Sequence, residues 1–219
     1  MTLDLSTIRT VLFDMDGVLY RGDQVLAGVD ELWRWLEAQG VHYACITNNA
    51  SRTPAQFTQK LADMGLQVPP ERIITSALTT NVWLRERAPQ GTTAYAVGMD
   101  GLRDVLFGDG YFVEQTERPA YVVVGADFEL TYAKLRTACL AIRAGAQFIG
   151  TNPDKTFPAE EGIVPGCGAL LAALEAATDV QPMVIGKPER AMFDTALHLL
   201  HAQATTTLMV GDRIDTDID

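Results

Sequence analysis

The chain has 219 residues, of which 47% are hydrophobic, and its 17 Lys and Arg against 28 Asp and Glu give a net charge of −11. This length and composition are typical of a soluble globular protein with one large domain or two small ones. An acidic surface repels nucleic acid and anionic membranes, and the sequence has neither an apolar stretch long enough to span a bilayer nor a basic, apolar N-terminal signal. We therefore expect a cytoplasmic protein with no nucleic-acid or membrane partner.

Four short apolar runs share one design, because each is typical of a buried strand that is followed at once by polar residues or glycine. In chain order they are Val11–Phe13 before Asp14, Tyr43–Ile46 before Thr47, Met183–Ile185 before Gly186, and Leu208–Val210 before Gly211. Strands that alternate with helices favour an α/β fold with a parallel sheet and right-handed crossovers. All four polar ends are then expected at one edge of that sheet, where ligands bind in open α/β folds.

Helical patterns lie between some of these runs, at residues 26–39, 54–64 and 192–201. In the first pattern, we expect Leu32, Trp35 and Leu36 to share one apolar face. The second pattern begins with Pro54 in its first turn, after Thr53 as the capping residue. Both patterns strengthen the prediction of alternating strands and helices.

The interval between the second and third runs is too long for a single crossover. Residues 81–180 carry strand-like runs at 94–97, 121–124 and 147–149, and helical patterns at 132–143 and 169–177. This is enough material for an inserted α/β domain, and an insertion near the predicted site indicates a cap over it. We therefore divide the chain into a first core part at 1–80, a cap domain at 81–180 and a second core part at 181–219.

Two aspartates, separated by one residue, follow the first apolar run. Two carboxylates placed there repel each other, so a cation is the natural way to keep both ionised. If the chemistry is phosphoryl transfer, we expect Asp14 to be the nucleophile that attacks phosphorus and becomes a phosphoaspartate. Asp16 is expected to protonate the leaving oxygen of the phosphate ester, and then to activate the water that attacks the phosphoaspartate. Asp212 is expected to join Asp14 on Mg²⁺, with the Asp16 carbonyl and waters completing an octahedron.

The remaining polar ends offer groups that bind phosphate. Thr47 and Asn48 supply hydroxyl, amide and backbone donors, and Lys187 supplies a charge that neutralises phosphate and helps to keep Asp14 ionised. Each of these motifs alone is more often a turn, a helix cap or an ordinary loop. Their conjunction, each at the end of an apolar run, favours metal-assisted chemistry on a phosphate.

These motifs resemble those of the haloacid dehalogenase (HAD) superfamily, in the capped branch, subclass IIA, that includes 4-nitrophenyl phosphatases. The matching stretches are Phe-Asp-Met-Asp-Gly-Val-Leu at 13–19, Thr-Asn-Asn-Ala-Ser at 47–51, Ile-Gly-Lys-Pro at 185–188 and Met-Val-Gly-Asp-Arg-Ile-Asp-Thr-Asp-Ile at 209–218. The resemblance implies a Rossmann-like core, an α/β cap, Mg²⁺ and an aspartyl-phosphate intermediate. A homodimer formed through the cap follows from family analogy alone.

The resemblance also assigns roles to the matching residues. It makes Asp14 the nucleophile, Asp16 the acid and base, and Lys187 their charge partner. The phosphate-binding motif comprises Thr47, Asn48 and Asn49, and the acidic residues assigned to the metal site are Asp14, Asp16, Asp212 and Asp217. Asp217 matches the second acidic position of the last motif, which implies outer support of the metal or the lysine.

Substrate specificity is assigned to the loop at 151–158. Its candidates are Asn152, Asp154 and Phe157, against the alternative of a solvated cap loop with a packed phenylalanine. In the pyridoxal phosphate branch a cap histidine contacts the substrate, and Phe157 lies near that position, which weakens a pyridoxal assignment. Arg52 is interpreted either as a phosphate contact or, preferably, as a surface residue.

These observations predict a Mg²⁺-dependent phosphatase of small-molecule phosphomonoesters. Asp16 favours phosphate hydrolysis, because dehalogenating relatives lack a carboxylate at this position. Two alternatives stay open. One is a signalling receiver that is phosphorylated on aspartate; the other is a catalytically impaired protein that binds phosphometabolites. The second arises because similar proteins continue beyond the last acidic motif, so we expect a short C-terminal end of the core.

Overall fold

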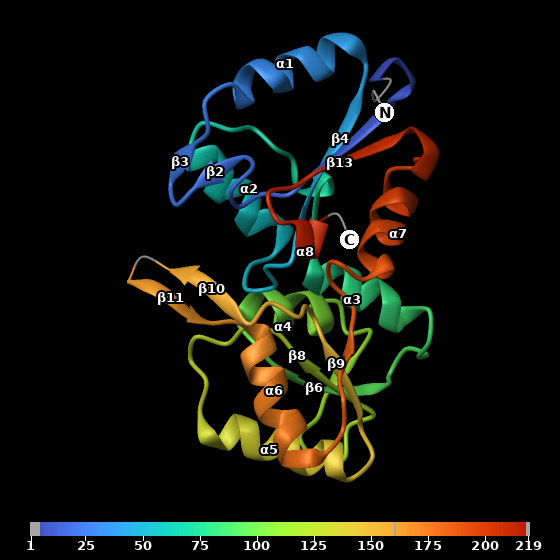
Figure 1. The fold of residues 1–219 in the computed structure, drawn as a ribbon. Helices are drawn as coiled ribbons and strands as arrows, with labels where there is room; N and C mark the ends of the chain where they lie inside the picture. Colours follow the sequence, from blue (N-terminus) through green and yellow to red (C-terminus); the bar gives the residue numbers. More distant parts are fainter. Residues whose placement is uncertain (1–4, 160, 218–219) are drawn as a thin grey trace.

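The structure is a computed structural model that describes residues 5–159 and 161–217. Within this part of the chain, two parallel sheets lie one above the other (Figure 1). The upper sheet has the order β13-β1-β4-β5, with bounds Thr207–Val210, Thr10–Phe13, His42–Thr47 and Ile73–Thr75. The lower sheet has the order β12-β9-β8-β6-β7, with bounds Met183–Val184, Gln147–Gly150, Tyr121–Val124, Thr93–Val97 and Val113–Glu114.

Helices cover both faces of each sheet. The upper sheet packs against α1 (Val29–Gln39) and α2 (Pro54–Asp63) on one face, and against α3 (Ser76–Arg85) and α7 (Arg190–Leu199) on the other. The lower sheet packs against α3 and α4 (Asp100–Phe107) on one face, and against α5 (Tyr132–Arg143) and α6 (Cys167–Thr178) on the other. Strands buried on both faces explain why β1 and β8 are continuous apolar runs.

Smaller elements complete the described fold. Two antiparallel hairpins pair β2 (Tyr20–Arg21) with β3 (Gln24–Val25) and β10 (Thr156–Ala159) with β11 (Gly162–Pro165). Short 3₁₀ helices span Leu5–Thr7, Pro70–Arg72 and Ala204–Thr206, and the short helix α8 spans Ile214–Asp217. None of the helices in residues 5–159 and 161–217 is long and apolar enough to cross a membrane.

The register of the upper sheet brings three polar segments to one edge. Phe13 at the end of β1 pairs with Cys45 in β4 and with Val210 in β13. The backbone N–H of Asp14 continues this pairing by donating to the Val210 carbonyl group at 2.9 Å. The residues that follow β1, β4 and β13 therefore lie side by side, as the sequence predicts for parallel strands.

The third apolar run belongs to a different sheet than predicted. We expected 183–185 to join the sheet of 11–13, but Met183 in β12 pairs with Ile149 in β9 of the lower sheet. An apolar run of three residues shows burial without specifying a partner strand, so the error came from assigning all four runs to one sheet. The chain returns from the lower sheet to the site only after Val184.

The buried face of α1 also differs from the prediction. Leu36 is buried, but Leu32 and Trp35 are 36% and 55% exposed, whereas Trp33 is only 6% exposed. The Trp33 ring lies between those of Phe13 and Tyr43, with centroid distances of 5.3 and 4.5 Å. Of the two tryptophans in α1, therefore, Trp33 packs against the sheet and Trp35 is exposed.

Because of this difference, replacing Trp33 should cost far more stability than replacing Trp35. We expect Trp33→Ala to lower the free energy of unfolding by about 3–5 kcal/mol, since it leaves a cavity against β1 and β4. Trp35→Ala is the matched control, and its effect is expected to stay within about 0.5 kcal/mol. Urea unfolding followed by circular dichroism measures both values, and equal losses would contradict the observed packing of α1.

Candidate active site

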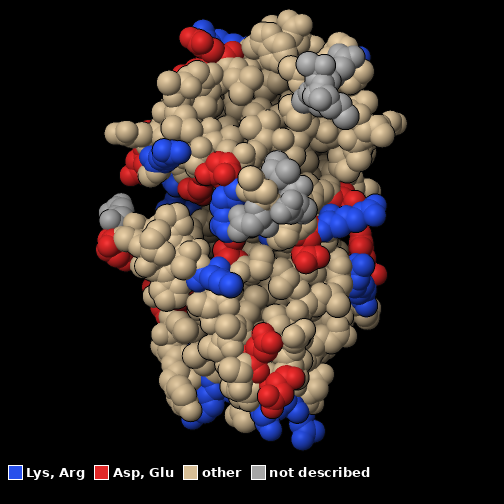
Figure 2. Space-filling model, in the orientation of Figure 1, with Lys and Arg blue, Asp and Glu red and all other residues tan. Residues whose placement is uncertain are grey.

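A cavity of about 430 Å³ lies between the two sheets, at the edge where β1, β4 and β13 end. Its wall combines residues of the upper sheet's loops with residues of the β10 hairpin and of the loop after β9. Figure 2 shows acidic and basic side chains together across the middle of the molecule, where the two halves meet. The site is therefore built by both sheets.

Three carboxylates meet at this cavity, and two of them contact one buried lysine. The Nζ atom of Lys187 lies 2.5 Å from Oδ1 of Asp14 and 2.6 Å from Oδ1 of Asp217. Carboxylate oxygens of Asp14, Asp212 and Asp217 all lie within 4.8 Å of one another. Lys187 is only 2% exposed, and such a buried charge is tolerated because two opposite charges hold it.

The electrostatics of Asp14 suit a site that holds a cation. Burial raises the pKa of the Asp14 carboxyl group from 3.8 to about 6, although Lys187 opposes the shift. Converging carboxylate oxygens are the ligands that Mg²⁺ prefers, so the donor set of Asp14 and Asp212 fits this ion. A divalent cation there would favour the ionised form of both groups.

Gly17 allows Asp212 to approach this cluster. Its backbone has a φ of 86°, a conformation that residues with a Cβ rarely adopt. A Cβ at this position would also overlap the Asp212 carboxylate. The glycine of the first motif is therefore needed for both the turn after β1 and the contact between the ends of β1 and β13.

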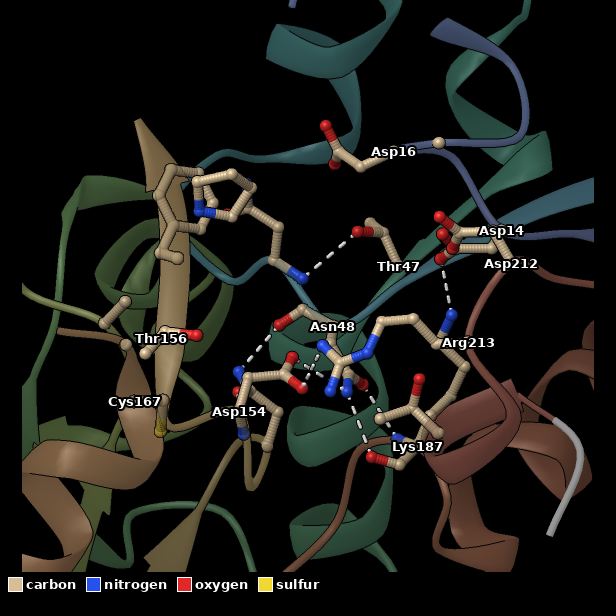
Figure 3. A pocket seen from close by; sticks show the side chains of 18 of the residues that line it. Asp14, Asp16, Thr47, Asn48, Asp154, Thr156, Cys167, Lys187, Asp212 and Arg213 are labelled. Carbon is tan, nitrogen blue, oxygen red and sulfur yellow. Dashed lines mark hydrogen bonds and ion pairs between the residues drawn. The ribbon is translucent and has the colours of Figure 1, made fainter. Parts of the chain in front are cut away.

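The Asp16 side chain lies apart from the carboxylates of Asp14 and Asp212 (Figure 3). Its Oδ2 atom accepts a hydrogen bond from the Tyr20 hydroxyl group at 3.2 Å. Burial raises the pKa of the Asp16 carboxyl group, against the opposing charge of Lys60. Asp16 therefore faces the cavity from a different side, and only its backbone carbonyl remains as the predicted metal ligand.

The motif after β4 folds on itself before it reaches the cavity. The Thr47 hydroxyl oxygen accepts from the backbone N–H of Asn49 at 3.1 Å. Oδ1 of Asn49 accepts from the backbone N–H and the hydroxyl group of Ser51, at 2.9 and 2.6 Å. Thr47 and Asn49 both line the cavity, and the Asn49 side-chain oxygen shapes the loop.

Asn48 contacts Lys187 through both ends of its side-chain amide. Its Oδ1 atom accepts from the Lys187 backbone N–H at 2.8 Å, and its Nδ2 atom donates to the Lys187 carbonyl group at 3.0 Å. Nδ2 also donates to Oδ2 of Asp154 at 3.1 Å. The side-chain amide that the sequence assigned to phosphate is therefore engaged with the protein itself.

The predicted specificity residues lie in the cavity wall, and one partner was missed. Asn152 is 4% exposed and donates from Nδ2 to the Asn48 carbonyl group at 2.7 Å. Oδ1 of Asp154 pairs with Nη1 of Arg213 at 3.1 Å, so this ion pair joins the lower half to the loop after β13. Its position directly after Asp212 is the sequence signal that could have identified Arg213 as a residue of the site.

The structure also shows what surrounds the last two candidates, Phe157 and Arg52. Phe157 in β10 lines the cavity and packs against Phe128, with ring centroids 5.3 Å apart. Arg52 lies instead beside a separate surface hollow that also contains Lys60 and Asp100. The interpretation of Arg52 as a phosphate contact therefore gains no support from its position.

Comparisons with known proteins agree with this architecture. The family model described as haloacid dehalogenase-like hydrolase matches residues 11–112, and a HAD-hydrolase-like model matches residues 184–219. The acid sugar phosphatase of Staphylococcus aureus strain USA300 is 39% identical over 210 residues, which cover 96% of this chain and 81% of that protein.

Two solved structures extend the comparison to the fold. The 4-nitrophenylphosphatase of Thermotoga maritima has a TM-score of 0.93 and 34% identity, over 98% of this chain and 82% of its own. NagD from E. coli K-12 has a TM-score of 0.89 and 31% identity, over 96% of this chain and 82% of its own. The predicted parallel α/β fold is thereby confirmed, and the chain belongs to the haloacid dehalogenase-like hydrolases.

Proposed function

We propose that this chain is a Mg²⁺-dependent phosphatase that hydrolyses small-molecule phosphomonoesters through an aspartyl-phosphate on Asp14. The carrying observation is the position of Asp14 in the cavity, beside a buried lysine and the Asp212 carboxylate. The names of the relatives, an acid sugar phosphatase and a 4-nitrophenylphosphatase, support the substrate class. Asp14, Asp212 and the Asp16 carbonyl group would hold Mg²⁺, which supplies positive charge to the phosphoryl oxygens when it is bound.

The first chemical step transfers the phosphoryl group to the protein. A carboxylate oxygen of Asp14 forms a bond to phosphorus while the bond to the substrate's ester oxygen breaks. Asp16 donates a proton to that leaving oxygen, and the buried position that raises its pKa favours the protonated form. The Thr47 hydroxyl group, the Asn48 backbone N–H and the Lys187 ammonium group would bind the phosphoryl oxygens.

The second step regenerates the aspartate. Asp16, now ionised, takes a proton from water, and the water oxygen forms a bond to phosphorus while the bond to Asp14 breaks. Inorganic phosphate leaves, and Asp16 is protonated again. The Tyr20 hydroxyl group holds the Asp16 carboxylate during both steps. Asp217 supports Lys187 by accepting a second hydrogen bond from the same ammonium group that contacts Asp14.

The lower sheet with its helices is our proposed cap, which limits access to small substrates. The loop after β9 and the β10 hairpin form part of the wall around the cavity. A volume of about 430 Å³ is suited to a small phosphorylated molecule. The division at residues 80 and 180, the dimer through the cap and the cytoplasmic location stay predictions.

Asp14→Asn is the direct test of the nucleophile. With Mg²⁺, we expect hydrolysis of 4-nitrophenyl phosphate to fall below about one-thousandth of the original rate, because an amide is a poor nucleophile. Asp194→Asn is the matched control, since Asp194 lies exposed on α7 and pairs with Arg190. Full activity of Asp14→Asn would refute the mechanism, whereas a folded original chain that binds phosphate without turnover would favour the binding-only alternative.

Asp16→Asn separates acid catalysis from general damage to the site. We expect kcat/KM to fall much further for an alkyl phosphate, such as glycerol 3-phosphate, than for 4-nitrophenyl phosphate. The reason is that nitrophenolate leaves without a proton, whereas an alkoxide needs one. Initial rates for both substrates give the ratio, and equal losses would contradict the role of Asp16 as the acid.

Asp212→Asn tests the metal site. Removing one of the two carboxylate ligands is expected to raise the Mg²⁺ concentration for half-maximal activity by about tenfold or more. Gly17→Ala is expected to act in the same direction, because the added Cβ displaces the Asp212 carboxylate. Activity measured against Mg²⁺ concentration, after removal of bound metal with EDTA, checks both variants. An unchanged Mg²⁺ requirement in Asp212→Asn would exclude it as a ligand.

A further inference from the structure

Asn48 lies where several segments of the two halves meet. It follows β4 of the upper sheet, and its contacts include the start of α3, the loop after β9 and the backbone of Lys187. The residue is 8% exposed, so these contacts are largely shielded from water. Hydrogen bonds in such a place fix geometry, because leaving any of the buried groups unpaired would be unfavourable.

The side-chain amide of Asn48 matches both backbone groups of Lys187. It accepts from the lysine N–H at 2.8 Å and donates to the lysine carbonyl at 3.0 Å. The side-chain amide of Asn offers an acceptor oxygen and a donor nitrogen side by side on one planar group, which matches a backbone carbonyl and N–H of the same residue. The neighbouring Gly186 permits this approach, because a Cβ there would lie 2.7 Å from Oδ1 of Asn48.

The backbone of Asn48 is held from two sides. The Ser76 hydroxyl group at the start of α3 donates to the Asn48 carbonyl group at 2.6 Å. Nδ2 of Asn152, after β9 in the lower sheet, donates to the same carbonyl group at 2.7 Å. These contacts hold the Asn48 backbone independently of its hydrogen bonds to Lys187.

Lys187 links this fixed point to the reacting group. Its backbone is bound by Asn48, and its Nζ atom lies between Asp14 and Asp217, at 2.5 and 2.6 Å. Because Lys187 enters from the lower sheet after β12, its ammonium reaches Asp14 only if its backbone is placed correctly against the upper sheet. The contacts of Asn48 supply that placement.

We propose that Asn48 is a positioning residue, whose side-chain amide fixes the backbone of Lys187 so that the ammonium group lies between Asp14 and Asp217. In this role the side chain does not hold phosphate, because binding phosphate through Nδ2 would break its bonds to Lys187 and Asp154. The importance of this position for turnover rests on the proposed function. The structural part of the inference does not require activity.

Acetylation of lysines tests the structural part without any turnover. In the original chain we expect acetic anhydride to modify Lys187 slowly, because its ammonium group is buried between two carboxylates, and Lys155 quickly, because it is exposed. Asn48→Ala should raise the labelling of Lys187 several-fold relative to Lys155, as measured by peptide mass spectrometry. Asn81→Ala is the matched control, since it removes a bond to Arg85 inside α3.

Kinetics test how the position affects the reaction. Asn48→Ala is expected to lower kcat by about 100-fold, the loss typical of a reacting group displaced by roughly 1 Å. Because Lys187 is also a proposed phosphate contact, the KM and the inhibition constant of inorganic phosphate should rise as well, but by a smaller factor than that by which kcat falls. A large rise in both constants with kcat preserved would show that the side chain binds phosphate and would overturn the proposal.

Exchanging the residues at positions 48 and 154 separates the effect of the Asn48 contact with Lys187 from that of its contact with Asp154. Asn48→Asp keeps the side-chain volume and the acceptor for the Lys187 N–H, but it loses the donor and places a carboxylate beside Asp154. Adding Asp154→Asn removes that repulsion and restores a hydrogen bond between positions 48 and 154 in the reverse direction. The bond to the Lys187 carbonyl group stays lost.

We expect the double variant to fold and to remain low in kcat, with Lys187 still more reactive than in the original chain. Full recovery of kcat and of lysine protection would show that Asn48 acts through Asp154, which overturns the proposal. If the original chain shows no hydrolysis, the proposed function fails, and lysine labelling alone then decides the positioning role. Unchanged Lys187 labelling in folded Asn48→Ala and in Asn48→Asp would refute it.

Discussion

The buried ammonium group of Lys187 is the constraint on which the site depends. A charge that is 2% exposed is strongly unfavourable unless opposite charges and hydrogen bonds surround it. Asp14 after β1 and Asp217 in α8 provide those charges, at 2.5 and 2.6 Å. The ends of β1 and β13 and the segment after β12 must therefore converge on one point before the lysine can be buried.

This requirement joins the two sheets at the cavity itself. Lys187 lies in the connection between β12 of the lower sheet and α7 on the upper sheet, and its ion pair with Asp14 fixes that connection at the end of β1. Asn48 binds the Lys187 backbone beside it, and the pair of Arg213 with Asp154 makes a further crossing link. Movement of one sheet against the other would therefore change the distances around Asp14 and Lys187.

Short sequence patterns predicted the features that depend only on neighbouring residues in the chain. The apolar run of β1 and the polar residue after it were sufficient to place Asp14 at a sheet edge, because burial on both faces requires a continuous apolar strand. The sheet that contains β12 and the role of the Asn48 side chain were not predictable in this way. Asn48 and Lys187 are 139 positions apart, and no local spacing encodes a hydrogen bond between them. For α1, two neighbouring tryptophans made the buried face ambiguous, and only the packing against Phe13 and Tyr43 decides it.

Under the proposed function, the charge balance of the site predicts that metal and phosphate binding are coupled. When ionised, Asp14, Asp212 and Asp217 contribute three negative charges against one positive charge on Lys187, which leaves a net charge of −2 in the cluster. A phosphate dianion is repelled by such a cluster, and the chain's overall charge of −11 adds to that repulsion. One divalent cation brings the cluster to neutrality, so it favours phosphate binding, and by reciprocity bound phosphate favours the cation. The third carboxylate, which balances the lysine, strengthens the predicted coupling, because the cluster repels a phosphate dianion when no positive charge is added.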